Sequence, residues 1–160
     1  EMSRKLTLSA CLFAAAAAWV AVEPARVEAK PPTDVPGAEP YLSMTTLGPY
    51  HGTVDGSSAV PIPADRRLVI EFVDARTTVP IGETPMITVY GRTSALSAPI
   101  ILPLTLAQTS SIYDDYRSSQ MVRLYYEGDG LHGPYFTCGS TGGFSISYCT
   151  VTISGYLIGK

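Results

Sequence analysis

The chain has 160 residues, 46% of them apolar, and its 14 acidic and 11 basic side chains give a net charge of −3 at neutral pH. This length fits one domain with a core of its own. The dispersed, mildly negative charge argues against nucleic acid as a partner, because phosphate binding requires a basic surface.

Residues 1–29 have the pattern of a secretory signal peptide. Arg4 and Lys5 precede an uncharged run from 6 to 22, and the segment ends at Ala29, a small residue of the kind that signal peptidase reads. The alternative is a permanent membrane anchor, because the uncharged run reaches the lower limit for crossing a bilayer. Its alanine-rich composition favours cleavage. We therefore expect a mature chain that is secreted, to the periplasm or outside the cell, and that keeps no membrane contact.

The mature chain divides into a proline-rich leader, residues 30–43, and a folded domain, residues 44–160. Four prolines fall within residues 30–40, which have no apolar periodicity, as in an extended polyproline-like chain. In the domain, short apolar runs alternate with glycine, proline, serine and aspartate. No stretch has the apolar spacing of an amphipathic helix.

Five runs in the domain have the alternating, β-branched and aromatic pattern of strands. Pro103 interrupts one run and predicts an edge strand or a bulge there. In the last run the apolar positions change parity, which predicts a bulge at 148–150. The serine-rich segment 110–119 is expected to form one helical turn or a long loop. The five runs are residues 68–73, 86–90, 98–106, 121–126 and 143–158.

The spacing of these runs and of the glycine-containing turns between them predicts an all-β fold. We expect an antiparallel β-sandwich, jelly-roll-like, with seven to nine strands in two sheets.

Two cysteines, Cys138 and Cys149, remain once the signal peptide is removed. In an exported chain such a pair is expected to form a disulfide, which for this short loop stabilises the fold by roughly 2–3 kcal/mol. The alternatives are weaker. A zinc site would have only His51 and His132 to add as ligands, and a redox pair prefers a C-x-x-C spacing.

Two stretches carry a resemblance to a known group of proteins. Residues 60–76 (VPIPADRRLVIEFVDAR), with 79–83 (VPIGE), and residues 149–158 (CTVTISGYLI) are similar to an uncharacterised family of short secreted bacterial proteins. Its members carry VPAGKRLVIEYVSA-like and VTISGYLV-like segments. The resemblance implies export and a β-sandwich but no catalytic residues, and Asp65 departs from it where the family has glycine. Residues 154–158 also resemble the closing strand of complement C1q-like jelly rolls, which form secreted trimers.

No motif in the chain indicates catalysis. His51 and His132 lie beside glycines and not near a G-x-S-x-G nucleophile turn, so both are interpreted as solvent-facing loop residues. Asp114 and Asp115 are adjacent and should point to opposite sides of an extended chain, which prevents them from flanking one glycosidic bond. The segment 127–130 (EGDG) fits a hairpin turn better than a calcium loop.

Tyrosine is the feature that indicates binding. The mature chain has ten tyrosines, several of them interleaved with charged residues between 113 and 135. Tyrosine offers a flat apolar face and a hydroxyl, which suits contact with a sugar or a protein, although packing on the sheet is the simpler explanation. The candidate binding residues are Tyr113, Asp114, Asp115, Tyr116, Arg117, Tyr125 and Tyr135.

We therefore expect a non-enzymatic, exported protein that acts by binding or assembly at the cell envelope or outside the cell, with neither cofactor nor metal. Its partner would be a protein, a glycan or further copies of the chain. The alternative is a carbohydrate-directed module, either a lectin or a weak glycoside hydrolase.

Overall fold

The computed structural model describes residues 35–51, 53–93, 97–141, 145–146 and 148–160. The predicted signal peptide and most of the proline-rich leader lie outside the described residues. Every regular element in these ranges is a strand, which confirms the predicted all-β class. The strands are β1 (Glu39–Leu47), β2 (Tyr50–His51), β3 (Val54–Ser57), β4 (Arg66–Pro80), β5 (Pro85–Arg92), β6 (Ser97–Ile101), β7 (Thr105–Thr109), β8 (Tyr113–Glu127), β9 (Tyr135–Ser140), β10 (Ser145–Ile146) and β11 (Tyr148–Gly159).

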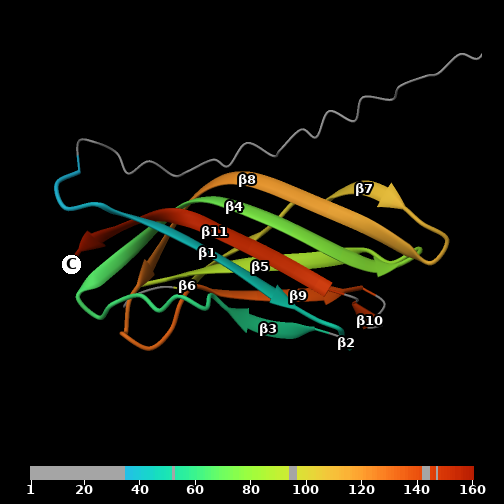
Figure 1. The fold of residues 1–160 in the computed structure, drawn as a ribbon, viewed down its shortest axis with the longest axis horizontal. Helices are drawn as coiled ribbons and strands as arrows, with labels where there is room; N and C mark the ends of the chain where they lie inside the picture. The colour runs from blue at the N-terminus through green and yellow to red at the C-terminus, as the bar shows by residue number, and fades with distance from the viewer. Residues whose placement is uncertain (1–34, 52, 94–96, 142–144, 147) are drawn as a thin grey trace, which may run out of the picture.

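Nine strands are hydrogen-bonded into a single sheet, and β10 and β2 form a separate small pair. The main order is β1-β11-β4-β8-β5-β9-β3, with β6 beside β5 and β7 beside β8. The sheet is mixed, because β5 and β8 run parallel at one pair, Arg92 and Tyr126. Figure 1 shows β1, β11, β4 and β8 in one layer and β5, β6, β9 and β3 in the other. The expected antiparallel sandwich is therefore not confirmed, since hydrogen bonds join the two layers.

The sheet nearly closes on itself where β1 approaches the segment after β3. The Tyr41 hydroxyl lies 2.7 Å from the Ser58 hydroxyl and donates to the Val60 carbonyl at 2.9 Å. The Thr45 hydroxyl donates to the Ser57 carbonyl. The strand β1 begins at Glu39, so part of the segment assigned above to the leader belongs to the sheet.

The core fills the space between the layers. Its largest fully buried side chain is Phe136 of β9, and the disulfide between Cys138 and Cys149 joins β9 to β11 within the core. This disulfide confirms the predicted pairing. The other fully buried members are aliphatic strand residues, together with Ile62 from the segment before β4: Leu68, Ile70, Val73, Ala75, Ile87, Val89, Val151 and Ile153.

Three local predictions differ from the structure. The segment 110–119 was expected to be a loop or a helical turn, but residues from Tyr113 onward form the first half of β8. The run 98–106 is divided into β6 and β7, with Pro103 in the break between them. The irregularity in β11 lies between Ser154 and Gly155, not at 148–150.

Candidate functional site

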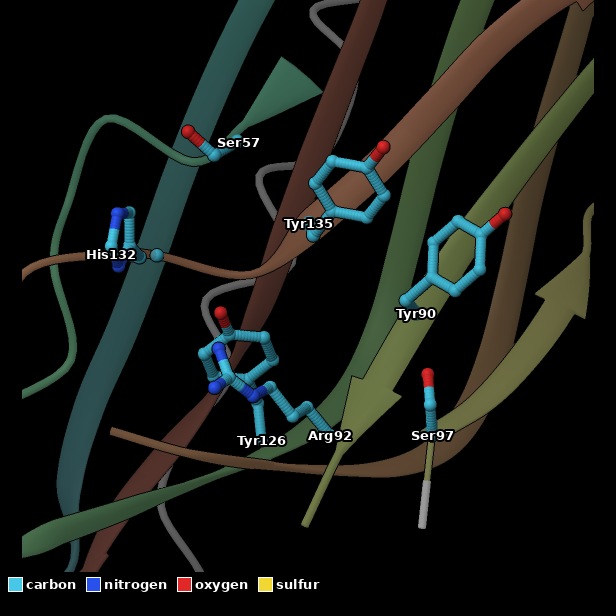
Figure 2. A pocket seen from close by; sticks show the side chains of 8 residues that line it. Ser57, Tyr90, Arg92, Ser97, Tyr126, His132 and Tyr135 are labelled. Carbon is cyan, nitrogen blue, oxygen red and sulfur yellow. The ribbon is translucent and has the colours of Figure 1, made fainter. Parts of the chain in front are cut away.

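A pocket of about 440 Å³ lies beside the ends of β5 and β8 and the start of β9. We call it the tyrosine pocket, because three tyrosines line it. Figure 2 shows that its side chains come from different elements, with Tyr90 and Tyr135 on neighbouring strands and His132 on a loop. The lining residues are Ser57, Tyr90, Arg92, Ser97, Tyr126, His132, Gly133 and Tyr135.

Strand alternation places Tyr90 and Tyr135 on the outer face of β5 and β9, whereas the third tyrosine, Tyr126, is only 3% exposed and belongs to the core. Ile87 and Val89 of β5 point into the core, so Tyr90 and Arg92 do not share their face. Tyr90 pairs with Tyr135 across β5 and β9, and the centroids of the two rings are 5.1 Å apart. The rings are tilted by 51°, an arrangement in which aromatic pairs attract each other.

One wall of the pocket is the loop 128–134, which connects β8 to β9. The loop packs against residues 58–63 so closely that a Cβ on Gly128 would lie 2.1 Å from the Pro63 carbonyl oxygen. A Cβ on Gly133 would lie 2.5 Å from the Ser58 carbonyl oxygen. Backbone hydrogen bonds, including Ile62 N–H to the His132 carbonyl, hold the two segments together. The glycines are therefore needed for a close approach that fixes the position of His132.

Asp129 organises this loop from within. One carboxylate oxygen accepts the backbone N–H groups of Leu131 and His132, each at 2.8 Å, and the other lies 2.7 Å from His132 Nδ1. The His132 ring and then the two N–H groups hold the pKa of the Asp129 carboxyl well below its usual value. Arg92 Nη1 lies 3.8 Å from the same carboxylate, beyond hydrogen-bonding distance.

A second carboxylate, that of Asp55, interacts with the hydroxyl of Tyr135. Tyr135 donates a hydrogen bond to Asp55, and this bond is the main cause that raises the pKa of the Tyr135 hydroxyl to about 12. Asp55 itself does not line the pocket. Both neighbouring carboxylates thus make their hydrogen bonds to other groups, and among the described lining residues Arg92 is the one with a permanent charge.

The polar groups do not form a catalytic arrangement among the described residues. Asp129 orients the His132 ring, as an acid does in a hydrolase, but no serine hydroxyl hydrogen-bonds that ring in the described part of the chain. Within the same residues no group of three or more histidine, cysteine, aspartate or glutamate side chains could hold a metal. The geometry supports ligand contact through aromatic rings, a guanidinium and hydroxyls.

Of the candidate binding residues, Tyr135 alone lines the tyrosine pocket. Tyr125 lies on the outer face of β8 and is 38% exposed. The remaining five, Tyr113, Asp114, Asp115, Tyr116 and Arg117, begin β8 and do not form an exposed loop.

The two adjacent aspartates are both buried, and they have different surroundings. Asp115 accepts hydrogen bonds from Nε and Nη2 of Arg76, and Arg117 lies 3.8 Å away. Asp114 is paired across the strands with Val79, which is fully buried, and its Oδ1 has no hydrogen-bond partner among the described residues. Cross-strand partners share a face, so Asp114 and Asp115 point to opposite faces as predicted.

Sequence reasoning missed Tyr90, Arg92 and Tyr126 as members of one site. One signal was present. Tyr90 and Arg92 are two positions apart on one strand, which places them on the same face. His132 was interpreted as an exposed loop residue, and it is exposed in a loop, but its neighbours could not be read from the sequence. The side chain of His51 lies outside what is described.

No family model matches this chain, and no curated protein matches it either. In the described residues no helix is long and apolar enough to cross a membrane.

Proposed function

We propose that this is an exported, non-enzymatic protein that acts by binding, and that its ligand occupies the tyrosine pocket. The observation that carries the proposal is the convergence of Tyr90, Tyr126 and Tyr135 with Arg92 and His132 around one space of about 440 Å³. Ligand sites of this size typically combine apolar rings with a few polar groups. The disulfide supports export, because such bonds persist in oxidising compartments.

Among ligands, a glycan fits the lining best. Tyrosine rings provide flat apolar faces on which sugar rings stack, and their hydroxyls supply hydrogen bonds. Ser57, Ser97 and His132 add polar groups around the rings. This supports the lectin form of the carbohydrate-directed module over the hydrolase form, since none of the described residues that line the pocket is a carboxylate.

The decisive experiment is a glycan array with the mature protein, followed by titration of each hit. Tyr90→Leu should weaken binding at least tenfold, because it removes one stacking face while leaving the core intact. Tyr113→Leu is the matched control, since Tyr113 lies on β8 and does not line the pocket. Equal loss in both variants, or no hit on the array, contradicts the glycan proposal.

Self-assembly is the second candidate, and an exposed apolar row supports it. Leu42, Phe72 and Met121 are aligned across β1, β4 and β8, with Ser154 of β11 between the first two. Leu42 is 58% exposed and Met121 is 76% exposed. Both lie on the outer face of the layer that β1, β11, β4 and β8 form. A second copy of the chain is the proposed occupant, in line with the jelly-roll trimers that the closing strand resembles. A monomer in size-exclusion chromatography with light scattering would exclude it.

The finer fold assignment is also a proposal. We propose that the two layers are those of a jelly-roll-like sandwich whose sheets have merged at β5 and β8. The single parallel pair there, Arg92 with Tyr126, supports this view, because the remaining pairings of the large sheet are antiparallel.

A further inference from the structure

The lining of the tyrosine pocket has a positive charge although the chain as a whole is negative. Arg92 contributes one permanent positive charge, and none of the eight lining residues is acidic. The chain carries a net charge of −3. A neutral sugar does not require a cation in the lining, so this charge is a clue to the chemical class of the ligand.

The nearest carboxylate, Asp129, forms only a long ion pair with Arg92, at 3.8 Å, and makes its hydrogen bonds to other groups. Asp129 accepts three hydrogen bonds, two from backbone N–H groups and one at His132, and Asp55 accepts the Tyr135 hydroxyl. Arg92 makes no hydrogen bond within the described residues, and its side chain is 59% exposed. Its five N–H donors can therefore meet a ligand.

The backbone around Arg92 is fixed. Arg92 pairs with Ser97 of β6 on one side and with Tyr126 of β8 on the other, at the junction of the two layers. A Cβ on the preceding Gly91 would lie 3.1 Å from the Tyr125 carbonyl oxygen, so the strands are closely packed there. The guanidinium thus extends from a rigid base beside the tyrosine rings, which lowers the entropy cost of binding.

We propose that the tyrosine pocket binds a saccharide that carries a carboxylate, with Arg92 holding the carboxylate and Tyr90 and Tyr135 contacting the sugar ring. This inference rests on the proposed function of the pocket. A guanidinium binds a carboxylate through two parallel hydrogen bonds. A single arginine matches the single charge of a uronic acid.

The test compares two probes that differ in charge and little in shape: the methyl glycoside of galacturonic acid, which carries one carboxylate, and its methyl ester. Each is titrated by calorimetry into the mature protein at 150 mM salt. We expect the acid to bind about tenfold or more tightly than the ester, as is typical of hydrogen bonds to charged groups. Raising the salt concentration should reduce this preference, because Arg92 is exposed to solvent.

Variants assign the preference to Arg92. Arg92→Gln should abolish the difference between the probes, so the ratio of the acid affinity to the ester affinity is the readout. Tyr90→Leu should weaken both probes equally. Arg117→Gln is the control, since Arg117 is an exposed arginine of β8 outside the pocket and should change neither affinity. Thermal unfolding of each variant verifies that it is folded.

The outcomes separate the two proposals. If acid and ester bind wild-type protein equally, or if Arg92→Gln keeps the preference, the carboxylate inference is wrong and the pocket remains a glycan site. If neither probe binds at millimolar concentration, the glycan assignment fails as well.

Discussion

Gly155 occupies the position in β11 where the fold tolerates a side chain least. A Cβ added to this residue would lie 1.9 Å from the carbonyl oxygen of Val69 and 3.1 Å from the Cα of Ile70. Both obstacles are backbone atoms of β4, so no rotamer change relieves the contact. The register between β11 and β4 shifts at this residue, which brings the two backbones together.

We therefore expect Gly155→Ala to destabilise the protein by about 3 kcal/mol, the upper end for overpacking, because strands in the middle of the sheet must move apart. For a chain of this size the midpoint of thermal unfolding should fall by about 10 °C. The matched control is Gly159→Ala in the same strand, where a Cβ meets no atom within 4 Å. Circular dichroism during heating measures the unfolding midpoint of both variants. If the midpoint of Gly155→Ala is within ~2 °C of that of Gly159→Ala, the steric reasoning is refuted.

Three further predictions concern the core and the pocket. Replacing Cys138 and Cys149 together by alanine should lower the free energy of unfolding by roughly 2–3 kcal/mol in denaturant titrations, and an unchanged midpoint would contradict a stabilising disulfide. Ser118→Ala should raise stability by about 1 kcal/mol, because the buried Ser118 hydroxyl has no partner among the described residues; a loss would mean that it has one. In an ultraviolet titration Tyr135 should ionise near pH 12, and Asp55→Asn should lower that pKa. The pKa of Tyr135 in the folded protein lies above the ordinary value of 10. The interaction of Tyr135 with Asp55 therefore contributes fully to folding stability below pH 10, and this contribution is lost as the pH rises through 12.

The strand pattern was readable wherever one face of a strand is apolar. Alternation in β5 reflects burial on one side, and Pro103 marked the break between β6 and β7. In β4 the alternation predicts Phe72 on the face of Leu68 and Ile70, but the register shifts after Ile70 and places Val73 in the core instead. The first half of β8 gave no such signal, because Asp114 and Ser118 are polar residues that are buried. The pairing with β4, which no local property reveals, overrides their preference for turns.

The pairing of the sheet as a whole was less predictable than its strands. A period of two says which residues share a face but not which strand lies beside another. The parallel pair of Arg92 and Tyr126 joins the layers that the sequence predicted as separate sheets. The disulfide could be predicted because only two cysteines, Cys138 and Cys149, lie outside the predicted signal peptide.

The tyrosine pocket could not be predicted from the sequence either, because its shape depends on contacts between segments that are distant in the chain. His132 lies where it does because the loop 128–134 is fixed from outside, by residues 58–63 and by the C-terminal Lys160, whose Nζ donates to the Gly128 carbonyl at 2.7 Å. Tyr90 and Arg92 come from a different strand, and they meet the loop only because β5, β9 and β3 pair in register. A list of tyrosines in sequence order therefore favours neighbours such as Tyr113 and Tyr116. The residues that share a ligand-sized space are the ones that the sheet brings together.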